Sequence, residues 1–315
     1  MRAVRTVTGP RWTVVRMPRP VPAPEEVLVR VRAAGLNRAD VLMRDDTYVP
    51  DDAGWSVATD RVGFEFSGEV VESTGEWSAG DAVLGQAGGT CAEFVTVDHR
   101  LLLRRPAGWS WTEAAAAPSA LLTEYDALMH VGGFRPGETV LVTGATSAVG
   151  LVAVGLASYL GAGRVVGTTR RRERAASVLA AGADDVLVGP PPRAEYTGTG
   201  FDVVLDHVGG ATLTAVIPLV RPGGRVVQIG RLGGGTALLD LEILARHRLS
   251  LLGTTFRGRR LPELANLIDA LRPHLSEFPR RPLIDSVFSL EEIEDAYERL
   301  ASPELFGKVV ITVDH

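Results

Sequence analysis

The sequence predicts an α/β protein that combines a doubly wound parallel sheet with a second domain of short strands. Between residues 119 and 257, short and nearly continuous apolar runs alternate with stretches of helical spacing. Such runs are typical of parallel strands covered on both faces, and their alternation with helices predicts a doubly wound, Rossmann-type sheet. Residues 1–118 and 258–315 instead carry short apolar runs that Gly, Pro and Asp interrupt, which is the pattern of short strands and turns.

Size and composition exclude several classes of protein. The length of 315 residues fits two domains at roughly 100–200 residues each. The net charge of −5 argues against a general affinity for nucleic acid or an anionic membrane. Cys91 is the only cysteine, which excludes an internal disulfide and a multi-thiolate zinc cluster. The N-terminus lacks the apolar segment of a signal peptide, and no apolar run reaches about 18 residues, so we expect a soluble protein of the reducing cytoplasm.

The individual elements follow from hydrophobic spacing. In the N-terminal region, short strands are expected at residues 27–31, 69–71 and 82–84. Residues 18–24 are rich in proline and are expected to form an extended connector. Buried strands are expected in the central region at 139–143, 164–167, 202–206 and 224–229, with a helix between the first two over 149–160. In the tail, we expect a strand at 283–288, an acidic amphipathic helix at 290–300 and a final strand at 308–313. We expect this tail to rejoin the N-terminal domain.

A turn of small residues follows the first central strand. Strand, turn and helix in this order point backbone N–H groups and a helix N-terminus at one place, where a pyrophosphate binds favourably. Ala145 and Ser147 take the first two glycine positions of a G-x-G-x-x-G motif, and only Gly150 matches the third. The motif alone is also compatible with an ordinary strand-to-helix turn. As a cofactor site, the turn comprises Thr146, Ser147, Ala148, Val149 and Gly150.

The end of the second central strand favours one cofactor over the other. An acid about 20 residues after the glycines binds the ribose of NAD, but residues 168–174 here read Thr-Thr-Arg-Arg-Arg-Glu-Arg. Guanidinium groups bind phosphate through paired, charge-assisted hydrogen bonds. Thr168, Arg170 and Arg174 therefore predict a site for the 2′-phosphate of NADPH. The alternative is a solvated, arginine-rich start of a helix.

Two further loops lie at the ends of the third and fourth central strands. Ligands of doubly wound sheets bind outside the carboxyl ends of the strands, so these loops should border the ribose and nicotinamide. The residues concerned are Val208, Gly230, Arg231 and Leu232. His207 is either a functional base or, as we favour, a loop residue satisfied by local hydrogen bonds.

Taken together, the motifs resemble those of the medium-chain dehydrogenase/reductase superfamily, in particular its zinc-independent quinone oxidoreductase branch. The resemblance covers nearly the whole chain and rests on the order and spacing of several segments, none decisive alone. These segments are 34–40, 62–70, 80–85, 91–95, 115–118, 123–128, 253–257 and 307–310.

The resemblance implies a GroES-like catalytic domain formed by 1–118 and 258–315 and a Rossmann NADPH-binding domain at 119–257. It also implies a homodimer through the edges of the Rossmann sheets, with 249–252 as the edge strand. Zinc-dependent relatives have a cysteine where Asn37 stands and a histidine where Phe64 stands, so a tetrahedral zinc site cannot form there. The six histidines show no metal-ligand spacing. We therefore expect no metal.

The activity implied by the resemblance is hydride transfer from NADPH to a small electrophile, either a quinone or an α,β-unsaturated carbonyl. Asn37 and Tyr48 are candidate donors to the acceptor oxygen, with Arg257 nearby and Asp40 orienting the loop. Alternatively, Asn37 only forms a turn and Tyr48 only packs. The nicotinamide is expected to be held by Thr123, Thr254, Thr255 and Phe256. The only lysine, Lys308, is placed near the cofactor, unless it is an ordinary surface charge.

Two other functions stay open. One is an enoyl reductase that acts on a thioester or a secondary-metabolite intermediate. The other is an NADPH-binding sensor or partner protein with little catalysis. A panel of quinones, enones and enoyl thioesters separates these possibilities.

Overall fold

The computed structural model describes residues 1–6, 11–44, 61–189, 200–256 and 259–314. The chain divides into two compact units. Unit 1 contains Met1–Ser119, Arg257–Glu277 and Arg281–His315, and unit 2 contains Ala120–Phe256 and Phe278–Arg280. Most of the tail thus belongs to unit 1, while three of its residues join unit 2.

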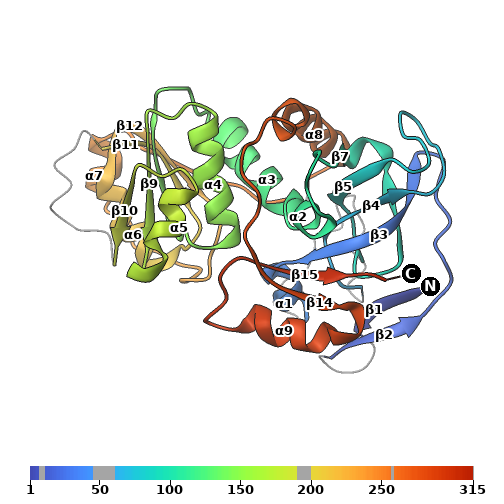
Figure 1. Ribbon diagram of the computed structural model, residues 1–315. Helices are drawn as coiled ribbons and strands as arrows, with labels where there is room; N and C mark the ends of the chain where they lie inside the picture. Colours follow the sequence, from blue (N-terminus) through green and yellow to red (C-terminus); the bar gives the residue numbers. More distant parts are fainter. Residues whose placement is uncertain (7–10, 45–60, 190–199, 257–258, 315) are drawn as a thin grey trace. The chain divides into compact units, whose positions relative to one another are not determined.

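Unit 2 contains a fully parallel sheet of six strands (Figure 1). In spatial order these are β10 (Asp185–Val188), β9 (Arg164–Thr169), β8 (Thr139–Val142), β11 (Phe201–Asp206), β12 (Val220–Gln228) and β13 (Ser250–Gly253). The strand order reverses between β8 and β11, which defines the topological switch point of a doubly wound sheet. This arrangement confirms the predicted fold class. The short, half-exposed strand β10 has no counterpart in the sequence prediction.

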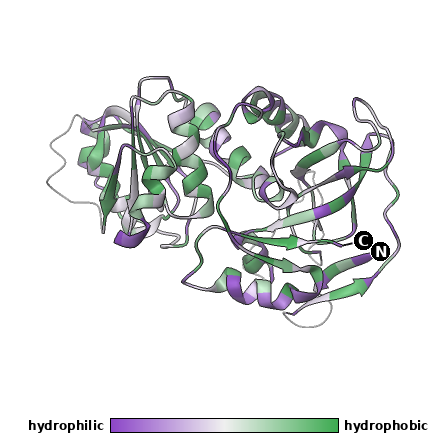
Figure 2. Cartoon of the chain, in the orientation of Figure 1, coloured by the Kyte–Doolittle hydropathy of each residue, from purple (hydrophilic) through white to green (hydrophobic). Residues whose placement is uncertain are grey.

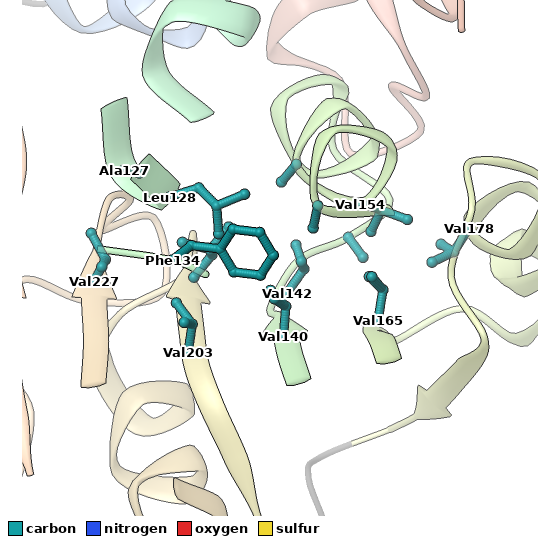
Figure 3. Close-up of a cluster of buried hydrophobic side chains, with 14 residues drawn as sticks. Ala127, Leu128, Phe134, Val140, Val142, Val154, Val165, Val178, Val203 and Val227 are labelled. Carbon is teal, nitrogen blue, oxygen red and sulfur yellow. The ribbon is translucent and has the colours of Figure 1, made fainter. Parts of the chain in front are cut away.

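Alternate residues of these strands contribute to two separate apolar cores. On one face, Val140 and Val142 pack with helix α4 (Ala148–Tyr159), helix α5 (Ala175–Ala180) and a π-helical segment (Asp126–Val131) (Figure 3). On the other face, Leu141 packs with helix α6 (Gly210–Val216) and its 3₁₀ extension (Ile217–Leu219). Because both faces are covered, the strands need no polar side. This explains the continuous apolar runs of the sequence.

Unit 1 contains a seven-stranded sheet centred on the long strand β3 (Glu26–Leu36), and a separate pair formed by β1 (Arg2–Thr6) and β2 (Trp12–Arg16). The order of the larger sheet is β14 (Ile284–Ser289), β15 (Lys308–Thr312), β3, β4 (Glu65–Val70), β5 (Ala82–Gln86) and β7 (Leu102–Arg104), while β6 (Phe94–Asp98) also pairs with β3. Antiparallel pairing places Val309 of β15 opposite Leu36 of β3. The C-terminal strand therefore lies beside the N-terminal part of the chain.

Helices in unit 1 are more prominent than the sequence analysis indicates. They are α1 (Arg38–Arg44), α2 (Trp111–Ala115), α3 (Pro118–Tyr125, which continues into unit 2), α8 (Leu261–Leu275) and α9 (Ile293–Ala301). Helix α9 begins after a short 3₁₀ turn, and polar and apolar residues alternate along it, as predicted (Figure 2). Helix α8 was missed because Pro262 and Pro273 interrupt its pattern, although its leucines recur at helical spacing. None of the helices in the described part of the chain is long and apolar enough to span a membrane.

The close packing of β9 against the turn after β8 yields a stability prediction. A Cβ added at Gly167 would lie 2.9 Å from Ala145 Cβ and would also collide with Val178. Overpacking of this kind costs about 1–3 kcal/mol, so Gly167→Ala should lower the free energy of unfolding by that amount in urea titrations. Gly253→Ala is the matched control, since a Cβ on that strand glycine meets nothing within 4 Å. An unchanged stability for Gly167→Ala would contradict the described packing.

Candidate functional site

The turn after β8 is shaped by two glycines and a helix cap. Gly144 has a positive φ of 59°, a conformation that glycine adopts without strain. Ser147 is the N-cap of α4, and its hydroxyl accepts a hydrogen bond from Gly150 N at 3.0 Å. A Cβ at Gly150 would approach Gly144 O to 2.5 Å. Gly150 therefore allows the helix to begin directly against the turn.

Strand β9 holds this turn in place. The hydroxyl of Thr168 accepts a hydrogen bond from Gly144 N at 3.2 Å, and the Thr168 carbonyl accepts one from Ala145 N at 3.0 Å. Ala145 is fully buried beside Gly167, whose missing side chain leaves room for the alanine methyl group. The departure from the glycine motif at Ala145 is thus compensated by a glycine on the neighbouring strand. Thr168 itself is buried and supports the turn from behind.

The turn provides a fitting cradle for a diphosphate. The first N–H groups of a helix lack intrahelical acceptors, and the positive end of the helix dipole favours an anion there. Thr146, Ala148 and Val149 are half-buried and Ser147 is exposed, so this end of α4 is open to a ligand. Two observations, the cap of α4 and the close approach at Gly150, therefore fit a dinucleotide site.

The arginine-rich segment lies directly after β9. Thr169 is buried, its hydroxyl accepts a hydrogen bond from Arg171 N at 3.1 Å, and this bond orders the turn that follows the strand. Arg170 is exposed and Arg174 is half-buried. Glu173 is the one acid in the segment, and it lies past the strand end on the 3₁₀ turn Arg172–Arg174. The carboxyl end of β9 therefore presents guanidinium groups and not the carboxylate that would bind a free ribose.

The loops after β11 and β12 are joined at the same edge of the sheet. The buried carboxylate of Asp206 accepts hydrogen bonds from Val208 N and Gly209 N at 3.2 and 3.0 Å, and the Val208 carbonyl accepts one from Gly233 N at 2.8 Å. Gly230 N donates to the Asp206 carbonyl. The structure thus brings Val208 and Gly230 together, while Arg231 and Leu232 lie on the exposed side of the loop.

The predicted nicotinamide residues come from two segments, namely α3, which carries Thr123, and the chain after β13, which carries Thr254, Thr255 and Phe256. Thr254 follows β13, and its hydroxyl donates a 2.7 Å hydrogen bond to the buried carboxylate of Asp126. Thr123 is half-buried on α3, three residues before Asp126. Thr255 and Phe256 continue from Thr254, with Thr255 exposed and Phe256 half-buried. Asp126 is a buried acid that the sequence analysis overlooks, since nothing local marks its partner 128 residues away.

His207 is satisfied by hydrogen bonds, but its side-chain bonds are not local. Its Nε2 lies 2.8 Å from Glu124 Oε1 on α3, and its Nδ1 lies 3.0 Å from the Thr143 carbonyl. The expectation of local bonds within the loop is therefore wrong. Glu124 is 83 residues away in sequence, and it is fully buried.

In unit 1, Asn37, Asp40 and Lys308 meet around Glu65. Lys308 donates to Asn37 Oδ1 at 2.6 Å and forms an ion pair with Glu65. Asn37 Nδ2 donates to Glu65 Oε1 at 2.9 Å, and the other carboxylate oxygen of Glu65 accepts a 2.7 Å hydrogen bond from Ser119 N. Glu65 and Lys308 are both buried. Interpreting Lys308 as an ordinary surface charge is therefore wrong.

This network restricts what the predicted residues can do. Both ends of the Asn37 amide are engaged with Glu65 and Lys308, which favours a positioning role over that of a donor to substrate. The Asp40 carboxylate accepts hydrogen bonds from Asn37 N at 2.7 Å and Gly63 N at 2.9 Å, so it orients the loop that begins α1. Tyr48 and Arg257 lie outside the described residues.

Glu65 is the residue of this network that the sequence analysis overlooks. It directly follows Phe64, and its partner Lys308 is the only lysine of the chain. An acid on a buried strand together with a single lysine was the available signal. In the described part of the chain, no group of three or more His, Cys, Asp or Glu side chains could hold a metal ion.

Burial gives Asp40 an unusual titration. Removal of the carboxylate from water raises its pKa to about 7, while the two backbone N–H groups and Lys308 lower the pKa and Glu65 raises it further. A raised pKa means that the folded state holds the proton more tightly than the unfolded chain does. The resulting stability is fully present below the unfolded value of 3.8 and is lost as the pH rises through about 7.

Asp40→Asn should remove this pH dependence. Between pH 4 and pH 8, the free energy of unfolding of the wild type should fall by about 4 kcal/mol relative to that of Asp40→Asn. This is the free energy that corresponds to a pKa of 3.8 in the unfolded chain and about 7 in the folded protein. Denaturant titrations at several pH values measure the difference. Asp269→Asn, which changes an exposed carboxylate of unit 1, should track the wild type at every pH. A constant difference between wild type and Asp40→Asn would contradict the described burial.

Comparison with known proteins matches both parts of the chain to family models. Residues 23–131 match the model described as alcohol dehydrogenase GroES-like domain, and residues 148–270 match the one described as zinc-binding dehydrogenase. Quinone oxidoreductase-like protein 2 of Bos taurus is 31% identical over 310 residues, which is 94% of this chain and 87% of that protein.

Longer proteins are also similar. The spectinabilin polyketide synthase system protein NorB of Streptomyces orinoci is 33% identical over 305 residues, which is 92% of this chain but only 13% of NorB. Among solved structures, the quinone oxidoreductase of Thermus thermophilus, reported alone and in complex with NADPH, has a TM-score of 0.82 and 32% identity over 99% of this chain and 100% of that one.

Proposed function

The chain belongs to the medium-chain dehydrogenase/reductase superfamily of oxidoreductases, and we propose that it transfers hydride from NADPH to a quinone or an α,β-unsaturated carbonyl without a metal. The observation that carries the proposal is the pairing of two features at one sheet edge in unit 2. A capped helix N-terminus follows β8, and the exposed Arg170 and half-buried Arg174 follow β9. Together they suit a diphosphate and a 2′-phosphate of the same dinucleotide.

Within this proposal the residues of unit 2 bind and orient the cofactor. NADPH, when bound, supplies the hydride from C4 of its nicotinamide. The turn from Thr146 to Gly150 binds the diphosphate, and Arg170 with Arg174 binds the 2′-phosphate. The loops that carry Val208 and Gly230, together with Thr254, lie at the carboxyl edge where the nicotinamide half would be oriented. The Thermus quinone oxidoreductase, whose NADPH complex is reported, supports this assignment.

The residues of unit 1 would serve the substrate. Hydride transfer needs donor and acceptor carbons at about 3–3.5 Å, and the charge on the acceptor oxygen needs hydrogen-bond donors. Since the amide of Asn37 is engaged by Glu65 and Lys308, Tyr48 and Arg257 stay the proposed donors, and Asp40 orients the loop that begins α1.

Two finer points belong to the proposal. Metal independence is supported by the residues at the two positions where zinc-dependent relatives have a cysteine and a histidine. Asn37 is a poor zinc ligand, and Phe64 has no atom that could bind zinc. A homodimer through the Rossmann sheet is supported by β13, which pairs with β12 alone in the described sheet and leaves Leu251 40% exposed.

A second candidate is an enoyl reductase that acts on a thioester. It is favoured by the 33% identity to a segment of NorB, a polyketide synthase system protein. A weakly catalytic NADPH-binding protein is the remaining alternative. Purified protein should be assayed with NADPH against short quinones, enones and enoyl thioesters, with and without a chelator. Turnover of quinones or enones that survives the chelator supports the proposal, turnover of thioesters alone supports the second candidate, and tight NADPH binding without turnover supports the third.

The arginine segment yields a cofactor prediction. Replacing Arg170 and Arg174 by alanine removes charge-assisted hydrogen bonds to the 2′-phosphate, so the Kd for NADPH should rise at least about tenfold. The Kd for NADH, which lacks that phosphate, should change little. Calorimetric titration of both dinucleotides measures the two values.

Arg164→Ala is the matched control, because this half-buried arginine, which pairs with Asp185, lies at the opposite end of β9. It should leave both affinities unchanged. Equal losses for NADPH and NADH in the double variant would remove the 2′-phosphate assignment, and folded wild-type protein that binds neither dinucleotide would remove the proposed function.

A further inference from the structure

Glu124 and His207 form a buried acid–base pair at the carboxyl edge of the unit 2 sheet. The side chains are 0% and 7% exposed, and Nε2 of His207 lies 2.8 Å from Glu124 Oε1. The second carboxylate oxygen of Glu124 has no hydrogen-bond partner among the described residues. The carboxylate therefore depends on His207 for its compensation, since an unpaired buried charge is strongly destabilising.

The geometry requires a shared proton. Nδ1 of His207 faces the Thr143 carbonyl at 3.0 Å, and because a carbonyl can only accept, Nδ1 carries a proton. The contact between Nε2 and Oε1 then needs one more proton, on either the imidazole or the carboxyl group. The pair is neutral as a whole in both arrangements. Loss of that proton would leave a lone pair facing a carboxylate and one net negative charge inside the protein.

The charges around His207 act in favour of retaining the proton. Burial disfavours the imidazolium, but Glu124, the Thr143 carbonyl and Asp206 outweigh burial and raise the pKa of His207 above its ordinary value of 6.5. Asp206 comes from the end of β11 and Glu124 from α3. The other buried acid of this region, Asp126, is directed at Thr254 and lies 3.4 Å from His130.

The pair connects three segments that carry predicted cofactor residues. Glu124 follows Thr123, His207 precedes Val208, and Thr143 begins the turn that leads to Gly150. The backbone of His207 also donates to Thr143 Oγ1 at 3.0 Å. A contact between α3, the end of β8 and the end of β11 at the topological switch point sets the shape of the crevice in which dinucleotides bind.

We infer that Glu124 and His207 are positioning residues whose shared proton holds the dinucleotide crevice in its binding shape. The inference rests on the proposed function. When the proton is present, a neutral hydrogen bond fixes α3 against the loop after β11. When the proton is lost, the hydrogen bond is broken and a negative charge is added near the site that binds the anionic dinucleotide. Cofactor affinity therefore decreases as the pH rises through the titration of the pair.

Glu124→Gln separates charge from shape. The glutamine amide can accept from a protonated Nε2 or donate to a neutral one, so the contact survives at every pH. Kd values for NADPH are measured by calorimetry from pH 7 to pH 9.5, where the 2′-phosphate, with a second pKa of about 6, is largely ionised throughout. We expect the wild-type Kd to rise about tenfold, as one added charge at roughly 10 Å produces in a medium of effective dielectric constant about 20. The Kd of Glu124→Gln should change by less than about threefold.

A spectroscopic measurement follows the proton itself. In the imidazole NMR spectrum, His207 of the wild type should stay doubly protonated to a higher pH than His207 of Glu124→Gln. A variant that alters only packing would not move this titration. His247→Gln is the matched control, because this half-buried histidine of unit 2 contacts Val220 at the opposite end of the sheet. The His247→Gln variant should show the same dependence of the NADPH Kd on pH as the wild type.

Two outcomes would overturn the inference without touching the proposed function. They are NADPH binding with the same pH profile in wild type and Glu124→Gln, and the same His207 titration in both proteins. Folded protein that binds no dinucleotide at any pH would overturn the proposed function together with the role in binding. In that case the NMR comparison would still decide whether the pair shares a proton.

Discussion

The hydrogen bond between Thr143 and Asp206 is the contact on which the described part of unit 2 depends. The Thr143 hydroxyl donates to Asp206 at 2.7 Å, and both residues are fully buried. Thr143 directly follows β8 and Asp206 ends β11, and these are the two strands between which the sheet reverses its order. The same carboxylate accepts the N–H groups of Val208 and Gly209, so one buried charge organises both the turn after β8 and the loop after β11. Without these donors the charge would be uncompensated, and the crevice could not keep its shape.

Features governed by local pattern could be predicted from the sequence, and features governed by distant partners could not. The parallel strands were predictable because burial on both faces leaves continuous apolar runs, and the turn at Gly150 was predictable because close backbone approach demands a small residue. Helix α8 was not, since its prolines disguise the helical spacing. The side-chain partner of His207 could not be predicted, because His207 lies in the loop after β11 and Glu124 lies on helix α3, 83 residues away. No periodicity connects two such residues, and only the folded chain brings them together.

The residues of unit 1 show why residue type alone does not assign a role. Asn37 has the chemistry of an oxyanion donor, and Lys308 has that of a phosphate ligand. In the structure both are engaged with Glu65, a buried carboxylate that needs a cation and a hydrogen-bond donor to be tolerated. The competition for donors inside the protein decides what remains for a ligand. Asp40 follows the same rule, because its two acceptor atoms are engaged by the backbone of the loop that it orients.

The two buried carboxylates at the switch point differ in one respect that matters for function. Asp206 is compensated by a hydroxyl and by backbone N–H groups, which do not titrate, whereas Glu124 is compensated by an imidazole, whose pKa its surroundings raise above the ordinary value. Any pH response of this edge through these two acids therefore passes through His207. Recognition of a 2′-phosphate by arginines after β9 would be insensitive to the same pH change, because guanidinium groups stay charged. Under the proposed function, choice of cofactor would therefore rest on the segment after β9, and the response to pH on the pair formed by α3 and the loop after β11.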